Sequence, residues 1–193
     1  MSTRLLPLFP LNTVLFPGGR LPLRLFEPRY LDLVRDCARH ASSFGICLIL
    51  DGDEAGTPAL PAALGCAARI VDFGTTDAGL LSITVQGEQR FRVQQTRVRD
   101  NGLMIADVEW LPESAPVRIR PEHSLLAIVL GRLLERAKVA FSNAELDDAD
   151  WVAWRLAEWL PLTMIERQAL LVENDPHQRL QQLVEHLPRF QAA

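Results

Sequence analysis

The spacing of apolar residues changes once along this 193-residue chain, across a proline-rich stretch at residues 112–121. Before this stretch, apolar side chains alternate with polar ones or form short runs bounded by glycine, as is typical of β-strands. After it, apolar residues between positions 125 and 137 recur at the 3.6-residue spacing of an α-helix. The chain therefore predicts an α+β fold, with a β-rich domain over residues 1–115 and an α-helical domain over residues 120–193.

One helix is expected inside the β-rich domain. Pro28 suits the first turn of a helix, and apolar residues between Tyr30 and Ala41 follow at helical spacing. Arg29 and Asp32 fall on the opposite face of this pattern, where solvent is expected. The helix should therefore pack its apolar stripe against a sheet.

The rest of this domain carries strand patterns separated by turn signals. Two prolines in residues 5–11 predict an edge or irregular strand, which would leave a backbone edge for an added strand. Residues 16–19 (Phe-Pro-Gly-Gly) predict a tight turn, and a second turn is expected at Gly87. The arginines change parity between Arg92 and Arg97, which predicts a bulge. The expected strands are residues 5–11, 21–26, 44–50, 65–73, 80–86, 89–99 and 103–111.

Capping residues mark the helices of the second domain. Thr163 and Glu166 have the spacing of a capping box, and Asp175-Pro176 resembles another helix start. An acidic segment at residues 147–150 stands where a helix N-terminus favours negative charge. The second domain is therefore expected to be helical as far as Pro188.

Charge also distinguishes the two domains. Residues 1–120 hold 13 arginines and 13 carboxylates, whereas residues 121–193 hold seven basic and 11 acidic side chains, a net charge of −4. Binding to a nucleic-acid backbone requires a concentration of basic side chains, which neither part shows. Nucleic acid is therefore disfavoured as a partner; an RNA-binding module is the alternative, although the arginines on the strands are better explained as a solvated outer face.

Neither metal nor membrane binding is expected. Cys37, Cys47 and Cys66 lie in apolar runs without a Cys-x-x-Cys pair, and the four histidines lack metal-ligand spacing. Buried thiols of this kind are typical of a reducing compartment. No apolar run reaches the roughly 18 residues of a membrane span, and the N-terminus lacks a signal-peptide pattern. These features predict a cytoplasmic protein without a metal ion, a cofactor or a membrane segment.

The residue inventory disfavours catalysis. The chain has one lysine, Lys138, and no Gly-Lys pair with which to form a phosphate-binding loop. Lys138 lies in a helical pattern, where a solvated position is expected. No Ser-His-Asp arrangement is interpretable, so a small hydrolase stays a third class that no constellation supports. The prediction is a protein without enzymatic activity of its own.

Several segments, in order along the chain, resemble the N-terminal domain of Lon-type proteases. Residues 8–23 are similar to its opening, in which an apolar-Phe-Pro-Gly turn leads to a Pro-Leu strand. Residues 65–70 and 85–93 resemble its Gly-x-x-Ala-x-Ile and Gly-x-x-Arg-aromatic-Arg segments. Residues 156–180 resemble its helical tail, with Gln-x-Leu-Leu followed by Arg-Leu. The resemblance extends from about residue 5 to about residue 187.

This resemblance implies a PUA-like antiparallel β pseudo-barrel with one helix, followed by a small α-helical bundle. Lon proteases continue into an ATPase domain and a Ser–Lys protease domain, and these 193 residues match the motifs of neither. No catalytic residue is carried over. The implied function is a freestanding protein- or peptide-binding module that resembles the substrate-recognition domain and acts as an adaptor in proteolysis or quality control. Expected partners are unfolded or apolar polypeptide segments, or a protease or chaperone.

Trp110 is the first candidate for a binding residue. It stands close to the predicted domain boundary, and clefts between domains commonly bind ligands. Arg90 and Arg92 alternate with Phe91 on one strand and are the further candidates. Trp151 and Trp154 share one helical face, so they are expected in the core of the second domain.

Overall fold

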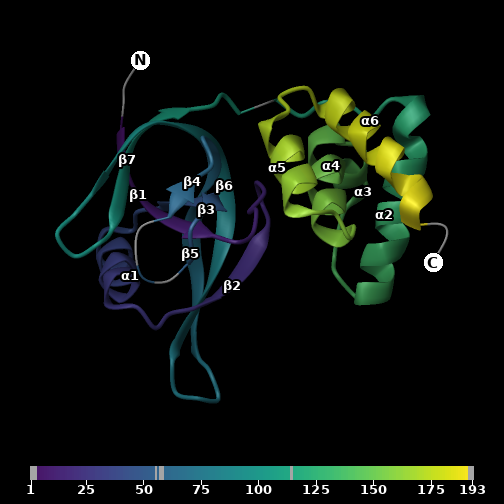
Figure 1. Ribbon diagram of the computed structural model, residues 1–193. Coiled ribbons are helices and arrows are strands. Elements are labelled where there is room, and N and C mark those ends of the chain that lie inside the picture. The colour runs from purple at the N-terminus through teal and green to yellow at the C-terminus, as the bar shows by residue number, and fades with distance from the viewer. Residues whose placement is uncertain (1–3, 55, 57–58, 114, 191–193) are drawn as a thin grey trace. The chain divides into compact units, whose positions relative to one another are not determined.

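The computed structural model describes residues 4–54, 56, 59–113 and 115–190. The chain divides into two compact units, Met1–Glu113 and Ser114–Ala193, which we call the β unit and the helical unit. All the strands of the described residues belong to the β unit (Figure 1). Its elements are β1 (Arg4–Leu11), β2 (Arg20–Arg24), α1 (Pro28–His40), β3 (Phe44–Asp51), β4 (Leu60–Pro61), β5 (Leu64–Thr75), β6 (Leu81–Val98) and β7 (Met104–Trp110).

Five strands of the β unit close into a barrel in the order β1-β7-β6-β5-β3 and back to β1. The pairing of β1 with β3 is parallel, and the other four are antiparallel. β2 pairs with β6, and the short β4 pairs with β3. The expected edge or irregular strand at residues 5–11 is confirmed in part: Arg4–Pro7 pair with β7 and Leu8–Leu11 with β3, so among the described residues each half of β1 has one edge without a strand partner. β1 tolerates its prolines because it changes partner between Pro7, which lies opposite β7, and Pro10, which lies opposite β3.

β6 is one continuous strand, so the turn expected at Gly87 is wrong. The turn after Phe16 packs against β6 at this point: the N–H of Gly18 donates to the carbonyl of Gly87, and the N–H of Gly87 donates to the carbonyl of Gly19, both at 2.8 Å. A Cβ atom on Gly87 would lie 2.1 Å from the carbonyl oxygen of Phe16. Glycine is thus required here by a close backbone approach. The turn after Phe16 is confirmed, with Gly18 at φ 74°.

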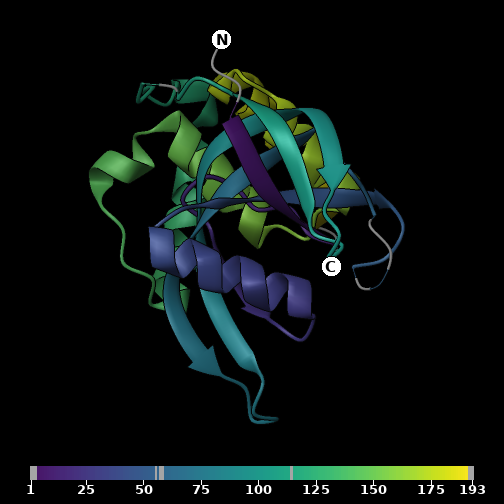
Figure 2. The ribbon, with the colours of Figure 1, turned by 90° about the vertical axis from the view of Figure 1, so that its left-hand side faces the viewer.

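α1 begins at Pro28 as expected and lies across the strands of the barrel (Figure 2). Its buried apolar side chains join Phe9 and other barrel residues in the larger core cluster. The predicted solvent face is wrong at one position: Arg29 is 7% exposed, whereas Ala41, expected in the stripe, is exposed. Arg29 is buried because its guanidinium reaches carbonyl groups far away in the sequence, which helical spacing alone does not reveal.

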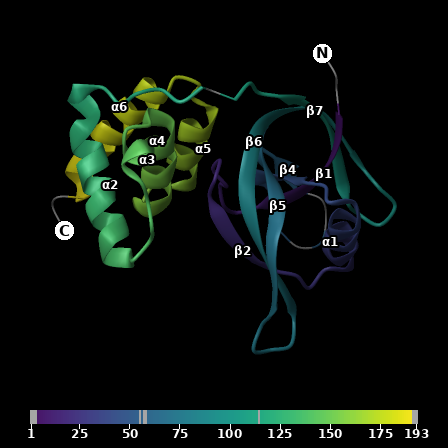
Figure 3. The same cartoon turned by 180° about the vertical axis from the view of Figure 1, so that it is seen from behind.

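A second core cluster in the β unit contains Phe91 together with Leu6, Leu8, Cys47, Ala67, Met104, Ala106 and Val108. A Cβ atom on Gly45 or Gly65 would come within 2.5 Å and 2.8 Å of the Phe91 ring, so these glycines make room for it. The bulge predicted from the arginine parity is confirmed between Val93 and Gln95. Beyond the barrel, β5 and β6 continue as a projecting hairpin (Figure 3).

The helical unit is built from helices whose starts match the capping signals. Both the Thr163–Glu166 capping box and the start at Asp175 are confirmed, since the Asp175 carboxylate accepts the N–H of His177 at 2.8 Å. A further capping box at Ser142 and Glu145 was not predicted. No helix among the described residues combines the length and apolarity needed to cross a membrane. The elements are a 3-10 turn (Pro121–His123), α2 (Ser124–Ala137), α3 (Asn143–Leu146), α4 (Ala149–Trp159), α5 (Met164–Val172), α6 (Pro176–His186) and a second 3-10 turn (Leu187–Phe190).

Candidate functional site

Trp110 ends β7 and packs against the second core cluster. Its ring meets that of Phe91, directly opposite on β6, in an edge-on contact with 6.0 Å between the centroids. The indole is nevertheless only half-buried. A half-buried tryptophan offers apolar area together with an N–H donor, which is the combination that binding sites favour.

The open side of Trp110 faces a hollow of about 740 Å³ in the β unit, which we call the Trp110 hollow. Leu5 contributes an apolar side chain that is 56% exposed. The polar groups are held in place: Ser43 donates to Glu88 at 2.5 Å, and the side-chain amide of Gln89 donates to the carbonyl of Leu111 at 2.6 Å. The hollow is therefore partly apolar, with a fixed polar rim. Its lining residues are Leu5, Leu6, Ser42, Ser43, Ala67, Glu88, Gln89, Trp110 and Glu113.

Neither of the two candidate arginines lines this hollow with Trp110. Arg90 is 7% exposed and lies opposite Cys66 on β5. Arg92 is exposed and lies opposite Glu109 on β7, where opposite charges on facing strands attract. Of the three candidate residues, the structure thus places Trp110 in this hollow and the two arginines outside it.

A second hollow, of about 340 Å³, lies between β1 and β2, and we call it the β1–β2 slot. Sequence patterns did not reveal it, because its walls come from four separate segments. Tyr30 stacks on Phe9 in its floor, with 3.8 Å between ring centroids, and Phe26 stands 61% exposed at its rim. Burial raises the pKa of Tyr30, so its hydroxyl stays protonated at neutral pH. The slot is lined by Phe9, Leu11, Thr13, Leu21, Pro22, Leu23, Arg24, Phe26, Glu27, Tyr30 and Glu54.

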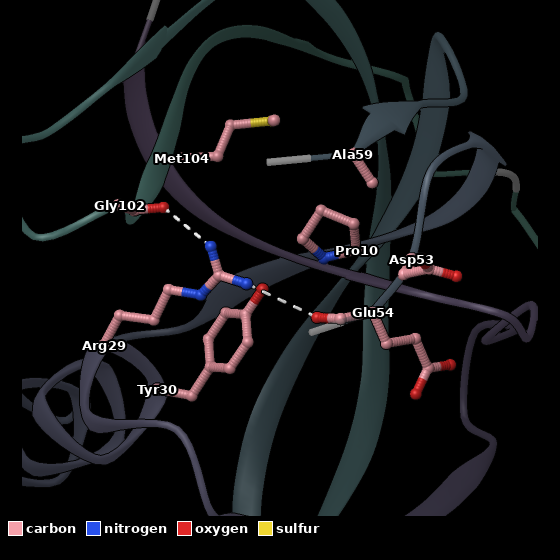
Figure 4. A pocket seen from close by; sticks show the side chains of 8 residues that line it. All are labelled: Pro10, Arg29, Tyr30, Asp53, Glu54, Ala59, Gly102 and Met104. Carbon is pink, nitrogen blue, oxygen red and sulfur yellow. Dashed lines mark hydrogen bonds between the residues drawn. The ribbon is translucent and has the colours of Figure 1, made fainter. Parts of the chain in front are cut away.

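Beside the slot, Arg29 joins three segments of the β unit (Figure 4). Its guanidinium donates to the carbonyls of Gly102 (3.1 Å) and Glu54 (3.4 Å) and pairs with the Glu27 carboxylate at 2.9 Å. It also lies 4.7 Å from the centre of the Tyr30 ring. The space left around it, about 10 Å³, admits at most one water molecule. Arg29 therefore serves to hold the walls of the slot in position.

The cysteines are confirmed as buried free thiols. Burial raises the pKa of Cys47 to about 12, and it also raises the pKa of Cys66 and Cys37. Thiols with raised pKa values are poor nucleophiles and poor metal ligands. Within the described residues, no group of three or more His, Cys, Asp or Glu side chains is placed to hold a metal ion.

The tryptophans of the helical unit differ in their surroundings. Trp154 is buried, as expected for the core, and the guanidinium of Arg179 stacks 3.4 Å from the centre of its ring. Trp151 is half-buried, and Trp159 is 42% exposed. None of the three lines either of the hollows described above.

The structure is similar to solved Lon N-terminal domains. The crystal structure of a Lon N-terminal domain protein from Xanthomonas campestris is 51% identical in sequence and matches with a TM-score of 0.81, over 95% of this chain and 98% of that one. The N-terminal domain of the Mycobacterium avium complex Lon protease matches with a TM-score of 0.70 at 19% identity, over 94% and 97% of the two chains. At that identity the second match concerns the fold alone. The predicted α+β class, with a mostly antiparallel barrel and a helical part, is confirmed.

Curated relatives are longer proteins. Cereblon from Danio rerio is 33% identical over 125 residues, which make up 63% of this chain and 28% of cereblon. A Lon protease from Roseiflexus castenholzii is 27% identical over 201 residues, covering 95% of this chain and 24% of the protease. The chain thus spans about a quarter of the length of these relatives. A family model of the substrate-binding domain of the ATP-dependent protease La (Lon) matches residues 5–189. Since this match covers nearly the whole chain, the chain belongs to the Lon substrate-binding domain family.

Proposed function

We propose that this protein binds unfolded or apolar polypeptide segments through its β unit, acts without catalysis, and delivers what it binds to a protease or chaperone in the cytoplasm. The observation that carries this proposal is the half-buried Trp110 at a 740 Å³ hollow in a member of the Lon substrate-binding domain family. The hollow is open to solvent, which suits weak binding of a polypeptide segment better than enclosure of a small ligand.

The side chains of the hollow suit a segment with both apolar and polar groups. Trp110 and Leu5 supply apolar surface, and the indole N–H supplies a donor, while Glu88 and Gln89 line the rim. Micromolar binding requires about 8 kcal/mol, and one aromatic anchor contributes roughly 2 kcal/mol. Weak capture of many different segments is therefore within reach of this surface.

The environment of the thiols supports a role without catalysis. Burial raises the pKa of each of the three thiols, Cys37, Cys47 and Cys66. A raised pKa leaves too little thiolate at neutral pH for nucleophilic attack.

The test is a titration of a fluorescently labelled, permanently unfolded protein against wild type, Trp110→Ala and Leu5→Ser, with melting curves alongside. Trp110→Ala should weaken binding about thirtyfold. Leu5 is already exposed, so Leu5→Ser should keep the melting temperature and weaken binding about threefold. Trp159→Ala, at an exposed tryptophan of the helical unit, is the matched control and should bind as wild type does.

The same titration with single-stranded RNA tests the alternative. The balanced charge of residues 1–120 supports polypeptide over RNA. Absence of binding to any unfolded protein at high micromolar concentration would contradict the proposal. Salt-sensitive RNA binding in its place would move the assignment to an RNA-binding module.

A further inference from the structure

We propose that the β1–β2 slot is a second, distinct subsite, which takes one bulky apolar side chain, aromatic or aliphatic, from a bound polypeptide, with a basic residue next to it. This inference rests on the proposed function and adds to it the kind of segment that is recognised. It is carried by two strand edges that face each other without pairing, by the aromatic groups between them, and by the charges at the rim.

The slot is a gap in the wall of the barrel. Within the described residues, Leu8–Leu11 of β1 pair with β3, and β2 pairs with β6. The other edge of each of these segments borders the hollow, since Phe9 and Leu11 line it from β1 while Leu21 and Leu23 line it from β2. The opening of about 340 Å³ thus borders the core cluster, whose members Phe9, Leu11, Leu23 and Tyr30 stay buried there, while Leu21 is partly exposed.

An added strand is a poor occupant for this gap. The N–H of Leu25 donates to the carbonyl of Leu81. Because backbone groups alternate in direction along an antiparallel strand, those of Leu23 and Leu21 also point to β6, whereas those of Pro22 point toward the slot. Proline has no N–H to donate, and Pro10 on the β1 side has none either. Pro22 thus removes one donor from the β2 edge that an added strand would need. Prolines at strand edges are a known protection against such pairing.

A side chain is a better occupant. The slot is near the small end of the volumes of ligand pockets, and its floor is the stacked pair of Phe9 and Tyr30. Phe26 stands at the rim with most of its surface in solvent, although it lies in a short connection where a polar residue would be usual. An aromatic or long aliphatic side chain that entered the slot would contact these three rings, which prefer stacked or edge-on partners.

The charges at the rim favour a basic neighbour. Two carboxylates, those of Glu27 and Glu54, line the slot, against one guanidinium, that of Arg24. Glu27 is already paired with Arg29, so the negative charge that the rim offers is that of Glu54, one oxygen of which accepts the backbone N–H of Asn12 at 2.5 Å. A lysine or arginine beside the inserted side chain would meet this fixed negative charge, and a carboxylate would be repelled.

The experiment uses the full chain and three labelled 12-residue peptides rich in glycine and serine. The first contains a Phe-Arg pair, the second Phe-Glu and the third Ser-Arg. We expect the first to bind best, the second up to about fivefold more weakly at low salt, with the difference reduced at high salt, and the third at least tenfold more weakly. The variant Phe26→Ala should weaken binding of the Phe-Arg peptide about tenfold.

The matched control is Phe73→Ala. Phe73 is 53% exposed and lies on β5 opposite Ile83 of β6, outside the slot, so this substitution should leave peptide binding unchanged. A photo-reactive phenylalanine in the Phe-Arg peptide should crosslink to β1, β2 or Tyr30. This measurement does not depend on the stability of any variant.

The outcomes separate the two proposals. If unfolded protein binds and loses affinity in Trp110→Ala but not in Phe26→Ala, or if the crosslinks fall outside the slot, the slot proposal is wrong and the proposed function stands. If unfolded protein binds but the Phe-Arg peptide does not, the slot proposal is likewise overturned. If neither binds, the proposed function itself has failed.

Discussion

Arg29 in the β unit and Arg179 in the helical unit are both buried, and they stabilise their units in different ways. Arg29 lies at the margin of the barrel, where it connects α1 to two loops and leaves the slot open beside it. Arg179 is fully buried among three helices. It donates to the carbonyls of Leu170 (3.2 Å) and Glu173 (2.6 Å), pairs with Asp150, and stacks on Trp154.

This difference indicates a division of roles. The barrel has a core that close backbone contacts hold together, as at Gly87, and it carries the two hollows to which we assign binding. The helical unit depends on polar groups in its interior, such as Arg179 with its partners, and burial shifts the pKa of Glu158 and His177 there. Substitutions in the helical unit should therefore act on stability, and those around the hollows should act on binding.

The largest effect is expected from Arg179→Met. Removing the guanidinium leaves the Asp150 carboxylate and two carbonyls without their donor in the interior, at a cost of about 3–5 kcal/mol. Denaturant unfolding followed by helical circular dichroism should show the loss. Arg132→Met, at an exposed position of α2, is the control and should change stability by less than about 0.5 kcal/mol. Equal loss in both variants would contradict the central role given to Arg179.

The second-largest effect is expected when glycine is replaced by alanine, and its sign should differ between a position in the β unit and one in the helical unit. Gly87→Ala places a Cβ atom 2.1 Å from the carbonyl oxygen of Phe16, and moving the backbone apart should cost about 1–3 kcal/mol. Gly131→Ala in α2 meets only ordinary contacts, the nearest at 3.5 Å, and the better helix propensity of alanine should add up to about 1 kcal/mol. Melting curves of both variants should move in opposite directions. A stabilised Gly87→Ala would show that the turn after Phe16 does not depend on this contact.

Local signals in the sequence predicted those elements whose cause is local. The helix start at Pro28, the capping box at Thr163 and the start at Asp175 each depend on residues within one turn, and all three are confirmed. Gly87 was misread because a glycine that makes room for a distant backbone resembles a glycine in a turn. The contact that distinguishes them is made with Phe16, 71 positions earlier in the sequence.

The hollows were harder to predict than the strands around them. Trp110 was selected for its position near the domain boundary, and the structure gives it a hollow formed with residues of the β unit itself. Arg29 was assigned to solvent because its partners Gly102 and Glu54 are 73 and 25 positions away. The slot combines Phe9, Leu21 and Tyr30 across three elements, so no window of the sequence contains it.

The smallest effect concerns pH and the helical unit. His177 at the start of α6 stacks on His123, with 5.7 Å between ring centroids, and both rings are buried. Burial lowers the pKa of His177, and the positive charge of Arg120 adds to the shift, while Asp175 and Glu122 oppose it. In the unfolded chain the imidazole of His177 takes up a proton near pH 6.5, whereas in the folded protein it does so only at lower pH. The His177 contribution to stability is thus present above pH 6.5 and is lost as the pH falls from there through the lowered pKa of the folded protein.

The measurement compares wild type with His177→Gln between pH 7.5 and 5.5 by chemical denaturation. The difference between them is needed because burial also raises the pKa of Glu158 to about 7, and protonation of this carboxylate stabilises the folded state as the pH falls. Asp175, whose pKa is lowered by the N–H groups of His177 and Gln178, stays ionised throughout this range. Acidification should cost wild type up to about 1 kcal/mol of unfolding free energy more than it costs His177→Gln.

The control is His40→Gln, at the exposed end of α1 in the β unit. This variant should retain the wild-type pH dependence, which would place the acid sensitivity in the helical unit. Identical pH profiles for wild type and His177→Gln would show that the buried histidine pair does not make the helical unit sensitive to acid.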